Sequence, residues 1–258
     1  MFFKTIDFSK YSSINIGPTV EVLMIEKEDQ IPKDRYLIGG ANNLLLSPHP
    51  PLLMMLSKDF ATIAQEEDNL VIGAAMPTGR IVSYAKKHNI AGFEFCSKLP
   101  GTLGGMLAMN AGVKEYEIFN ILHSVKIDGK WILASKIEHG YRFAKLGGIA
   151  THARFKIQNG FDYALLKNLL ALRSNQPSLP SAGSIFKNPE GDYAGRLIEA
   201  VGLKGAKKGD MQWSQMHANF LVNLGKGTFE DALSLIRLAK EKVHQAFGID
   251  LQEEIKIL

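Results

Sequence analysis

Short apolar segments alternate with glycine-rich turns through the first 160 residues. Most of them are rich in β-branched or aliphatic residues and end at turn formers, so the pattern predicts strands. They are "VEVLMI" (20–25), "RYLIGG" (35–40), "LLMML" (52–56), "NLVIGAA" (69–75), "SVKID" (124–128) and "ATHARFKI" (150–157). A helix is predicted from about Pro77 to His88, where Ile81, Tyr84 and Ala85 share one face.

Helical spacing of apolar residues dominates from about residue 160 onward. It predicts helices over 162–175, 192–202 and 228–248. The third is the clearest, because Thr228 and Asp231 resemble a capping box and Gly248 is a typical stop. The last residues alternate like a strand. Together these elements predict an α+β chain whose ligand-holding first part is followed by a smaller α+β part.

Composition narrows the class of protein. The chain has 258 residues, 46% hydrophobic and 22% charged, which is typical of a globular protein. The single cysteine, Cys96, allows no internal disulfide, and neither a signal peptide nor a membrane span is evident, so a cytoplasmic location is expected. The net charge of +4 is dispersed, which argues against nucleic acid and fits small anionic ligands. The histidines are scattered without metal-ligand spacing.

Two glycine loops are candidates for binding phosphate. In the first, Gly39, Gly40, Ala41 and Asn42 directly follow a predicted strand, where small residues let backbone N–H groups approach an anion. The second, "PGTLGGMLAMNAG" (100–112), is denser in glycine. Taken together, the loops favour one dinucleotide-sized ligand. A tight turn and a close helix–sheet packing are the structural alternatives.

Ser184, in "SAGSIFKNP" (181–189), is the candidate for chemistry. It has no neighbouring histidine base and fails the GxSxG pattern, which counts against acyl transfer. A serine that donates a proton to a carbanion-like carbon needs no base. By pattern alone, Ser184 is a cap or turn hydroxyl, Arg142 a surface cation, Glu254 a solvated edge charge and His217 a turn histidine.

Seven motifs carry a resemblance to a known family. In chain order they are "IGGANNLLL", "LPGTLGGMLAMNAG", "GYR", "AGSIFKNP", "AGRLIEAVGLKG", "HANFLVN" and "LQEEIKI". They resemble the UDP-N-acetylenolpyruvoylglucosamine reductases from about residue 10 to the end. The resemblance implies an α+β fold of the FAD-binding PCMH (vanillyl-alcohol-oxidase) type, with two subdomains and a smaller substrate-binding domain. The expected boundaries are 1–160 for FAD binding (subdomains about 1–60 and 61–160), 161–248 for the substrate, and 249–258 for a strand that brings Glu254 to the active site.

The resemblance also assigns site residues. The implied catalytic residues are Arg142, the proton donor Ser184, and Glu254. Asn188 is implied to contact the substrate, and Lys187, His217 and Asn219 fall in matching motifs with less defined roles. The residues implied to bind the flavin are Gly39, Gly40, Ala41, Asn42, Asn43, Leu44, Pro100, Gly101, Thr102, Gly104, Gly105, Asn110, Ala111 and Gly112.

The implied reaction is the NADPH-dependent reduction of UDP-N-acetylglucosamine enolpyruvate to UDP-N-acetylmuramate, in peptidoglycan precursor synthesis. Hydride passes from N5 of reduced FAD to C3 of the enolpyruvyl group, and Ser184 supplies the C2 proton. Arg142 offers a charged fork to the substrate carboxylate. Glu254 is a second donor if burial raises its pKa and keeps it protonated.

The chain departs from the family pattern in two places. "GGANN" replaces the commoner "GGGSN", and the insertion that carries a substrate-covering tyrosine is missing, so the chain resembles the shorter subclass. A monomer without nucleic-acid or membrane partners is expected. Two other hypotheses stay open: a flavin-dependent alcohol oxidase of the same fold, and a non-catalytic UDP-sugar-binding module. No Walker-type loop supports a phosphate-transferring enzyme.

Overall fold

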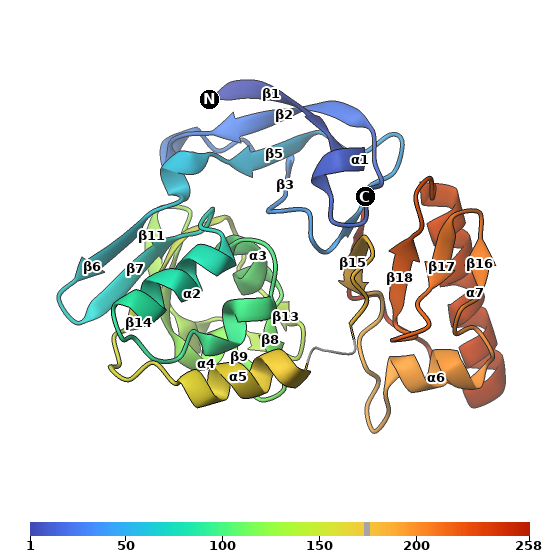
Figure 1. Ribbon diagram of the computed structural model, residues 1–258. Helices are drawn as coiled ribbons and strands as arrows, with labels where there is room; N and C mark the ends of the chain where they lie inside the picture. Colours follow the sequence, from blue (N-terminus) through green and yellow to red (C-terminus); the bar gives the residue numbers. More distant parts are fainter. Residues whose placement is uncertain (173–175) are drawn as a thin grey trace. The chain divides into compact units, whose positions relative to one another are not determined.

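A computed structural model of the chain describes residues 1–172 and 176–258, and it divides into two compact units (Figure 1). The first unit contains residues 1–4, 22–40 and 52–174, and the second contains residues 5–21, 41–51 and 175–258. Each unit has a core of its own. The larger core of the first unit includes Phe93 and Phe155, whereas that of the second includes Phe186 and Trp213.

The first unit is built mainly on two sheets. The four-stranded sheet has the order β1-β2-β5-β3, in which β5 runs parallel to both β2 and β3. The five-stranded sheet is antiparallel, with the order β11-β10-β14-β7-β6. The strands are β1 (Phe2–Asp7), β2 (Thr19–Ile25), β3 (Tyr36–Leu37), β5 (Leu53–Leu56), β6 (Ile63–Glu66), β7 (Asn69–Gly73), β10 (Leu122–Ile127), β11 (Lys130–Leu133) and β14 (Ala150–Lys156).

Helices and two short hairpins complete the first unit. Helix α3 packs against β7 and β14 of the five-stranded sheet. The helices are α2 (Thr78–Lys87), α3 (Leu103–Ala108), α4 (Ile118–Ile121) and α5 (Tyr163–Leu172), with 3₁₀ helices over Glu28–Gln30, Lys58–Phe60, Glu94–Lys98 and Ala134–Lys136. The hairpins are β8 (Gly112–Val113) with β9 (Tyr116–Glu117), and β12 (His139–Gly140) with β13 (Phe143–Ala144).

The second unit places helices beside a four-stranded antiparallel sheet of order β15-β18-β17-β16. The long helix α7 contacts β16, β17 and α6 (Figure 1). The elements are α1 (Phe8–Tyr11), β4 (Leu44–Leu45), β15 (Ser181–Ser184), α6 (Ala194–Ala200), β16 (Lys207–Lys208), β17 (Met211–Trp213), β18 (Phe220–Asn223), α7 (Phe229–Phe247) and β19 (Lys256–Ile257).

Helix α7 forms as its sequence predicts. Thr228 Oγ1 accepts a hydrogen bond from the Asp231 N–H, and the Asp231 carboxylate accepts from the Thr228 N–H, so the predicted capping box is confirmed. Gly248 ends the helix with a φ of 67°, a left-handed value that glycine adopts without strain. Ala232, Ile236 and Val243 lie on its buried face.

The predicted elements are confirmed where the pattern is long. All six predicted strands exist, and the helix predicted over 77–88 is α2. The helix predicted over 162–175 extends through Leu172 as α5, and residues 173–175 lie outside the described part of the chain. The helix predicted over 192–202 is the shorter α6. The pattern missed α3, because glycines interrupt its apolar spacing.

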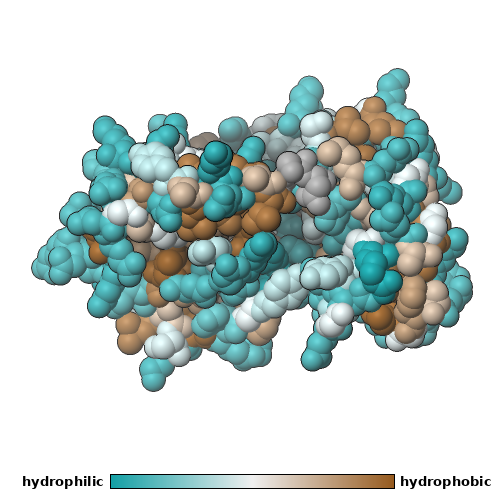
Figure 2. Space-filling view, turned by 60° about the horizontal axis from the view of Figure 1, so that its bottom comes forward, coloured by the Kyte–Doolittle hydropathy of each residue, from teal (hydrophilic) through white to brown (hydrophobic). Residues whose placement is uncertain are grey.

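The predicted α+β class is confirmed. Each compact unit is made of several separate segments of the chain, whereas each expected domain is one continuous segment. The expected domains stay a prediction, because packing does not say which segment binds which ligand. In the described part of the chain, no helix combines the length and apolar character needed to cross a membrane. Hydrophilic side chains cover most of the face seen in Figure 2, with separate apolar patches between them.

Candidate functional site

Ser184 is the last residue of strand β15, and an irregularity just before it sets its position. Ser181 pairs with Val222 and Ser184 pairs with Phe220, with a register shift between the two pairs. Gly183 has a φ of 82° and open space where a Cβ would be, so a glycine is needed there for its backbone and not for room. Such bulges re-aim side chains next to functional sites. The left-handed backbone at this irregularity is the local reason for the glycine before Ser184.

Asn219 holds the chain that follows Ser184. Its side chain is 3% exposed; Oδ1 accepts from the Phe186 N–H at 3.0 Å, and Nδ2 donates to the Phe186 carbonyl at 2.7 Å. The Asn219 carbonyl accepts from the Ile185 N–H at 2.9 Å. The Asn219 side chain therefore serves to position this segment, and its contact with a substrate stays a prediction.

Replacing Asn219 with alanine is expected to lower the free energy of unfolding by about 2 kcal/mol or more. The reason is that both backbone groups of Phe186 lose a partner, and each buried polar group left unsatisfied costs about 1–3 kcal/mol. Urea titration followed by circular dichroism measures the change. Gln215→Ala removes an exposed amide from the same turn and is the control. Equal stability of the two variants would contradict this role.

Glu254 is tied to the residue after Ser184. The Glu254 N–H donates to the Ile185 carbonyl at 2.8 Å, and a bridge pairs Phe186 with Glu253. From the first glycine loop, Asn43 Nδ2 donates to the Glu254 carbonyl at 3.0 Å. The expected strand over 249–258 is confirmed only as β19, and Glu254 lies in the bend before it. The second unit thus brings Ser184, Glu254 and Asn43 together.

A pocket of about 280 Å³ adjoins Ser184 in the second unit. Its lining combines polar and apolar side chains from β15, α6 and the turn before β18. The residues are Ser184, Asn188, Tyr193, Gly195, Arg196, Glu199, Met216, His217, Ala218 and Asn219. Its volume lies just below the usual range for ligand sites, about 300–1,000 Å³, so it suits part of a nucleotide-sized ligand.

His217 is poised as a neutral donor in this pocket. Its Nδ1 accepts from the Asn219 N–H at 3.3 Å, which leaves the proton of the neutral ring on Nε2. Burial lowers the pKa of His217, which favours this neutral form. The ring also packs edge-on against Phe220 and lies close to Gly195, where an added Cβ would be 3.3 Å from Cε1.

The pocket contains residues that sequence reasoning missed. Arg196 and Glu199 lie one helical turn apart on α6, and Met216 is 56% exposed. Tyr193, which the sequence offered as a residue that either touches the substrate or packs the helix, also lines the pocket and is 69% exposed. The Arg196 guanidinium pairs with Asp192 and lowers the pKa of that carboxyl to about 2. The i,i+4 spacing of this pair was the available signal.

Asn188 and Lys187 are placed by backbone contacts. Asn188 Oδ1 accepts from the N–H of Ala194, the first residue of α6, at 3.1 Å. The Lys187 N–H donates to the Gln252 carbonyl at 2.9 Å. Asn188 therefore links the Ser184 segment to the helix that lines the pocket. Contacts of either side chain with a substrate stay a prediction.

The two glycine loops meet in the first unit. A Cβ added at Gly39 would lie 2.8 Å from Thr102 Oγ1, so the two loops approach each other closely at this point. Thr102 also caps α3, since its Oγ1 accepts from the Gly105 N–H at 3.4 Å. Gly104 packs on Ala74, where an added Cβ would be 3.2 Å from the carbonyl oxygen. Close packing, the structural alternative for these glycines, is therefore confirmed, and their approach to a ligand stays a prediction.

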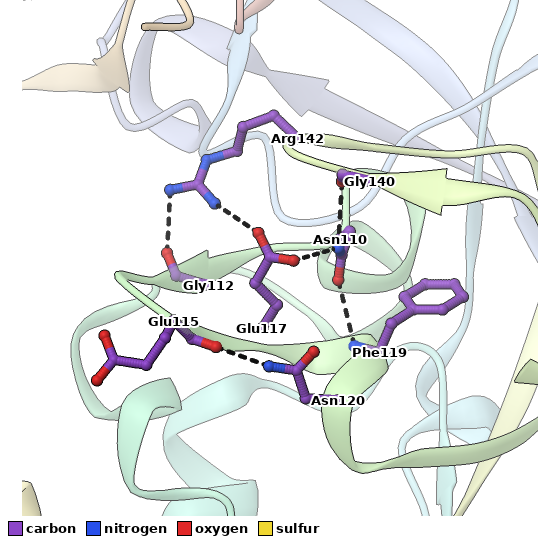
Figure 3. Close-up of polar contacts among 8 residues, drawn as sticks. All are labelled: Asn110, Gly112, Glu115, Glu117, Phe119, Asn120, Gly140 and Arg142. Carbon is purple, nitrogen blue, oxygen red and sulfur yellow. Dashed lines mark hydrogen bonds and ion pairs between the residues drawn. The ribbon is translucent and has the colours of Figure 1, made fainter. Parts of the chain in front are cut away.

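Arg142 lies at the tip of the β12–β13 hairpin, also in the first unit (Figure 3). Its φ of 58° is a left-handed value, a strained conformation that costs a non-glycine residue about 1–3 kcal/mol and is frequent at functional sites. Nη2 donates to the Gly112 carbonyl at 3.1 Å, and Nη1 lies 4.0 Å from Glu117 Oε1. The guanidinium is thus oriented by protein groups before any ligand binds.

Comparisons with known proteins agree across the full length of the chain. Residues 175–258 match the family model described as UDP-N-acetylenolpyruvoylglucosamine reductase, C-terminal domain. The chain is 49% identical to the UDP-N-acetylenolpyruvoylglucosamine reductase of Helicobacter hepaticus, with 98% of each chain covered. It is 48% identical to that of Campylobacter jejuni strain RM1221, with 98% of this chain and 99% of the relative covered.

A solved structure supports the same relationship. The crystal structure of UDP-N-acetylenolpyruvylglucosamine reductase (MurB) from Thermus caldophilus aligns with a TM-score of 0.86 at 28% identity, covering 100% of this chain and 99% of that one. Fold, motif order and identity over the whole length therefore agree, and the chain belongs to the UDP-N-acetylenolpyruvoylglucosamine reductase family.

Proposed function

We propose that this protein reduces UDP-N-acetylglucosamine enolpyruvate to UDP-N-acetylmuramate, a peptidoglycan precursor, with FAD as cofactor and NADPH as electron donor. The observation that carries the proposal is the position of Ser184. It lies in the wall of a polar pocket, and the residue after it binds the Glu254 backbone. The His217 ring in the same pocket accepts a backbone N–H at Nδ1 and carries its proton on Nε2, so it offers Ser184 no base, and a hydroxyl without a base suits proton donation and not nucleophilic attack.

The glycine loops supply the cofactor site in this proposal. Gly39 approaches Thr102 closely, and Asn43 and Leu44 continue the first loop toward Glu254. Their small side chains let backbone N–H groups reach a diphosphate. When bound, FAD supplies a two-electron carrier between NADPH and the substrate.

Three side chains of this chain then handle the enolpyruvyl group. Ser184 delivers a proton to C2, the carbon next to the carboxylate. Arg142 offers a planar, permanently charged fork to that carboxylate, where negative charge develops during reduction. Glu254, in its protonated form, is the second donor to the carboxylate.

The pocket beside Ser184 receives the nucleotide-sugar part of the substrate. His217 presents the Nε2–H of its neutral ring, and Arg196 provides a cation on α6. Tyr193 is exposed at the pocket, where its ring is available to a planar or apolar part of the ligand. Asn188 keeps the pocket wall joined to the Ser184 segment.

Purified protein is expected to be yellow, and anaerobic NADPH should bleach the visible absorbance of the flavin. Adding UDP-N-acetylglucosamine enolpyruvate should restore the colour. Colourless protein that binds a UDP-sugar without FAD would contradict the proposal and favour a binding module. Reduced protein that ignores the enol ether but is rapidly reoxidised by oxygen would favour an oxidase.

A further inference from the structure

Glu117 lies beside Arg142 and was not among the residues expected to act. It ends strand β9, where it pairs in register with Gly112 of β8. Arg142 contacts both members of this pair, the Gly112 carbonyl at 3.1 Å and the Glu117 carboxylate at 4.0 Å (Figure 3). The guanidinium is therefore held by one residue pair of the β8–β9 hairpin, through the carboxylate of one residue and the carbonyl of the other.

Asn110 fixes the Glu117 carboxylate in turn. Its side chain is fully buried; Nδ2 donates to Glu117 Oε2 at 2.7 Å and to the Gly140 carbonyl at 3.1 Å. Its Oδ1 accepts from the Phe119 N–H at 3.2 Å. Asn110 thus joins the end of the second glycine loop to the two hairpins that carry Glu117 and Arg142, and its side chain is engaged by protein groups.

The hairpin geometry demands the glycine at 112. A Cβ there would lie 2.8 Å from the Glu117 Cα, so any larger residue would push the two strands apart. The Glu117 and Arg142 side chains are 21% and 18% exposed, so solvent screens their interaction only in part. A partly buried anion at a set position orients a guanidinium more firmly than a solvated one does.

We infer that Glu117 is a positioning residue for Arg142, and that Asn110 holds Glu117 in place for this task. The inference rests on the proposed function, in which Arg142 binds the enolpyruvyl carboxylate. Glu117 itself makes no contact with substrate in this account. Its charge sets the orientation of the fork, and its removal therefore affects a ligand that carries the carboxylate and spares one that lacks it.

The test compares two ligands in the holoenzyme, UDP-N-acetylglucosamine enolpyruvate and UDP-N-acetylglucosamine. Glu117→Gln keeps the size of the side chain and an acceptor for Asn110 but removes the charge. We expect flavin reoxidation by the enolpyruvate to slow on the order of tenfold or more, as small misplacements of a catalytic group do. Flavin reduction by NADPH and calorimetric affinity for UDP-N-acetylglucosamine should stay within about twofold, the usual scatter of single contributions.

Glu115→Gln is the matched control. Glu115 lies in the turn of the same hairpin, is exposed, and points its carboxylate away from Arg142 in Figure 3. This variant should behave as the wild type with both ligands. In an Arg142→Lys background, Glu117→Gln should add little further loss, because the fork it orients is already gone.

Wild-type reoxidation kinetics in Glu117→Gln, or equal losses for the two ligands, would overturn the inference. A wild-type enzyme that the enolpyruvate does not reoxidise would instead overturn the proposed function, so the two failures are distinct. If Glu117→Gln does not fold, Glu117→Asp provides the test instead. Aspartate keeps the charge but places it one methylene farther from Arg142. If Glu117→Asp slows reoxidation by the enolpyruvate less than about tenfold and leaves the affinity for UDP-N-acetylglucosamine unchanged, the positioning role is supported. Equal losses for the two ligands would overturn that role.

Discussion

Replacing Ser184 with alanine is expected to slow the reoxidation of the reduced flavin by UDP-N-acetylglucosamine enolpyruvate by roughly 10²- to 10⁴-fold, the usual worth of a general acid. Reduction of the flavin by NADPH should stay nearly intact, because only the second half-reaction needs a proton at C2. Stopped-flow absorbance separates the two steps.

Ser181→Ala is the control for this experiment. Ser181 lies on the same strand, β15, but outside the pocket lining, so its loss should change neither half-reaction. A Ser184→Ala enzyme with crippled reduction by NADPH and normal reoxidation would show that the assigned role is wrong. Ser184→Ala should leave the fold unchanged. The end of β15 is held by its pairing with Phe220 and by the contacts of Asn219 with Phe186, and alanine disturbs neither.

Replacing Arg142 with lysine is expected to slow the same reoxidation by roughly 10- to 100-fold although the charge is kept. A charge-assisted hydrogen bond contributes about 1.5–3 kcal/mol, and lysine cannot reproduce a bidentate fork. Lysine also cannot reach the Gly112 carbonyl and Glu117 in the same geometry as the two terminal nitrogens of Arg142. Stopped-flow traces over a range of substrate concentrations give both the rate and the affinity.

Arg154→Lys is the matched control for Arg142→Lys. Arg154 lies on β14, stacks over Trp131 with 3.9 Å from its Cζ to the ring centroid, and pairs with Glu66. Its replacement removes a planar fork elsewhere in the same unit and should leave both half-reactions unchanged. Normal turnover in Arg142→Lys would mean that this guanidinium does not hold the substrate carboxylate.

Local patterns predicted much of the fold. The capping box of α7 and the apolar strands bounded by turn residues depend on residues within a few positions of one another, so the sequence alone reveals them. The motifs "GSIFKNP" and "HANF" likewise predicted the family, which the comparisons confirm. Helix α3 escaped prediction because its two glycines resemble a loop, whereas the structure shows Gly104 packed on Ala74.

The roles of the amides depended on partners that spacing does not reveal. Asn43 binds the backbone of Glu254, which is 211 positions away in the chain. Asn219, just before β18, holds Phe186, just after β15, and Asn110 holds Glu117 and the hairpin that carries Arg142. An asparagine side chain both donates and accepts, so whether it binds a ligand or the protein is decided by what lies within reach.

The sequence by itself determined the longer helices, the main strands, the family, and the identity of the reactive candidates Ser184, Arg142 and Glu254. Only the tertiary structure joined Ser184 to Glu254 through Ile185, opened the pocket beside them, and placed Glu117 against Arg142. The physical reason is the separation along the chain over which each kind of interaction acts. Propensity and capping act over a few neighbouring residues, whereas hydrogen bonds and ion pairs between distant segments exist only after each unit has packed its core.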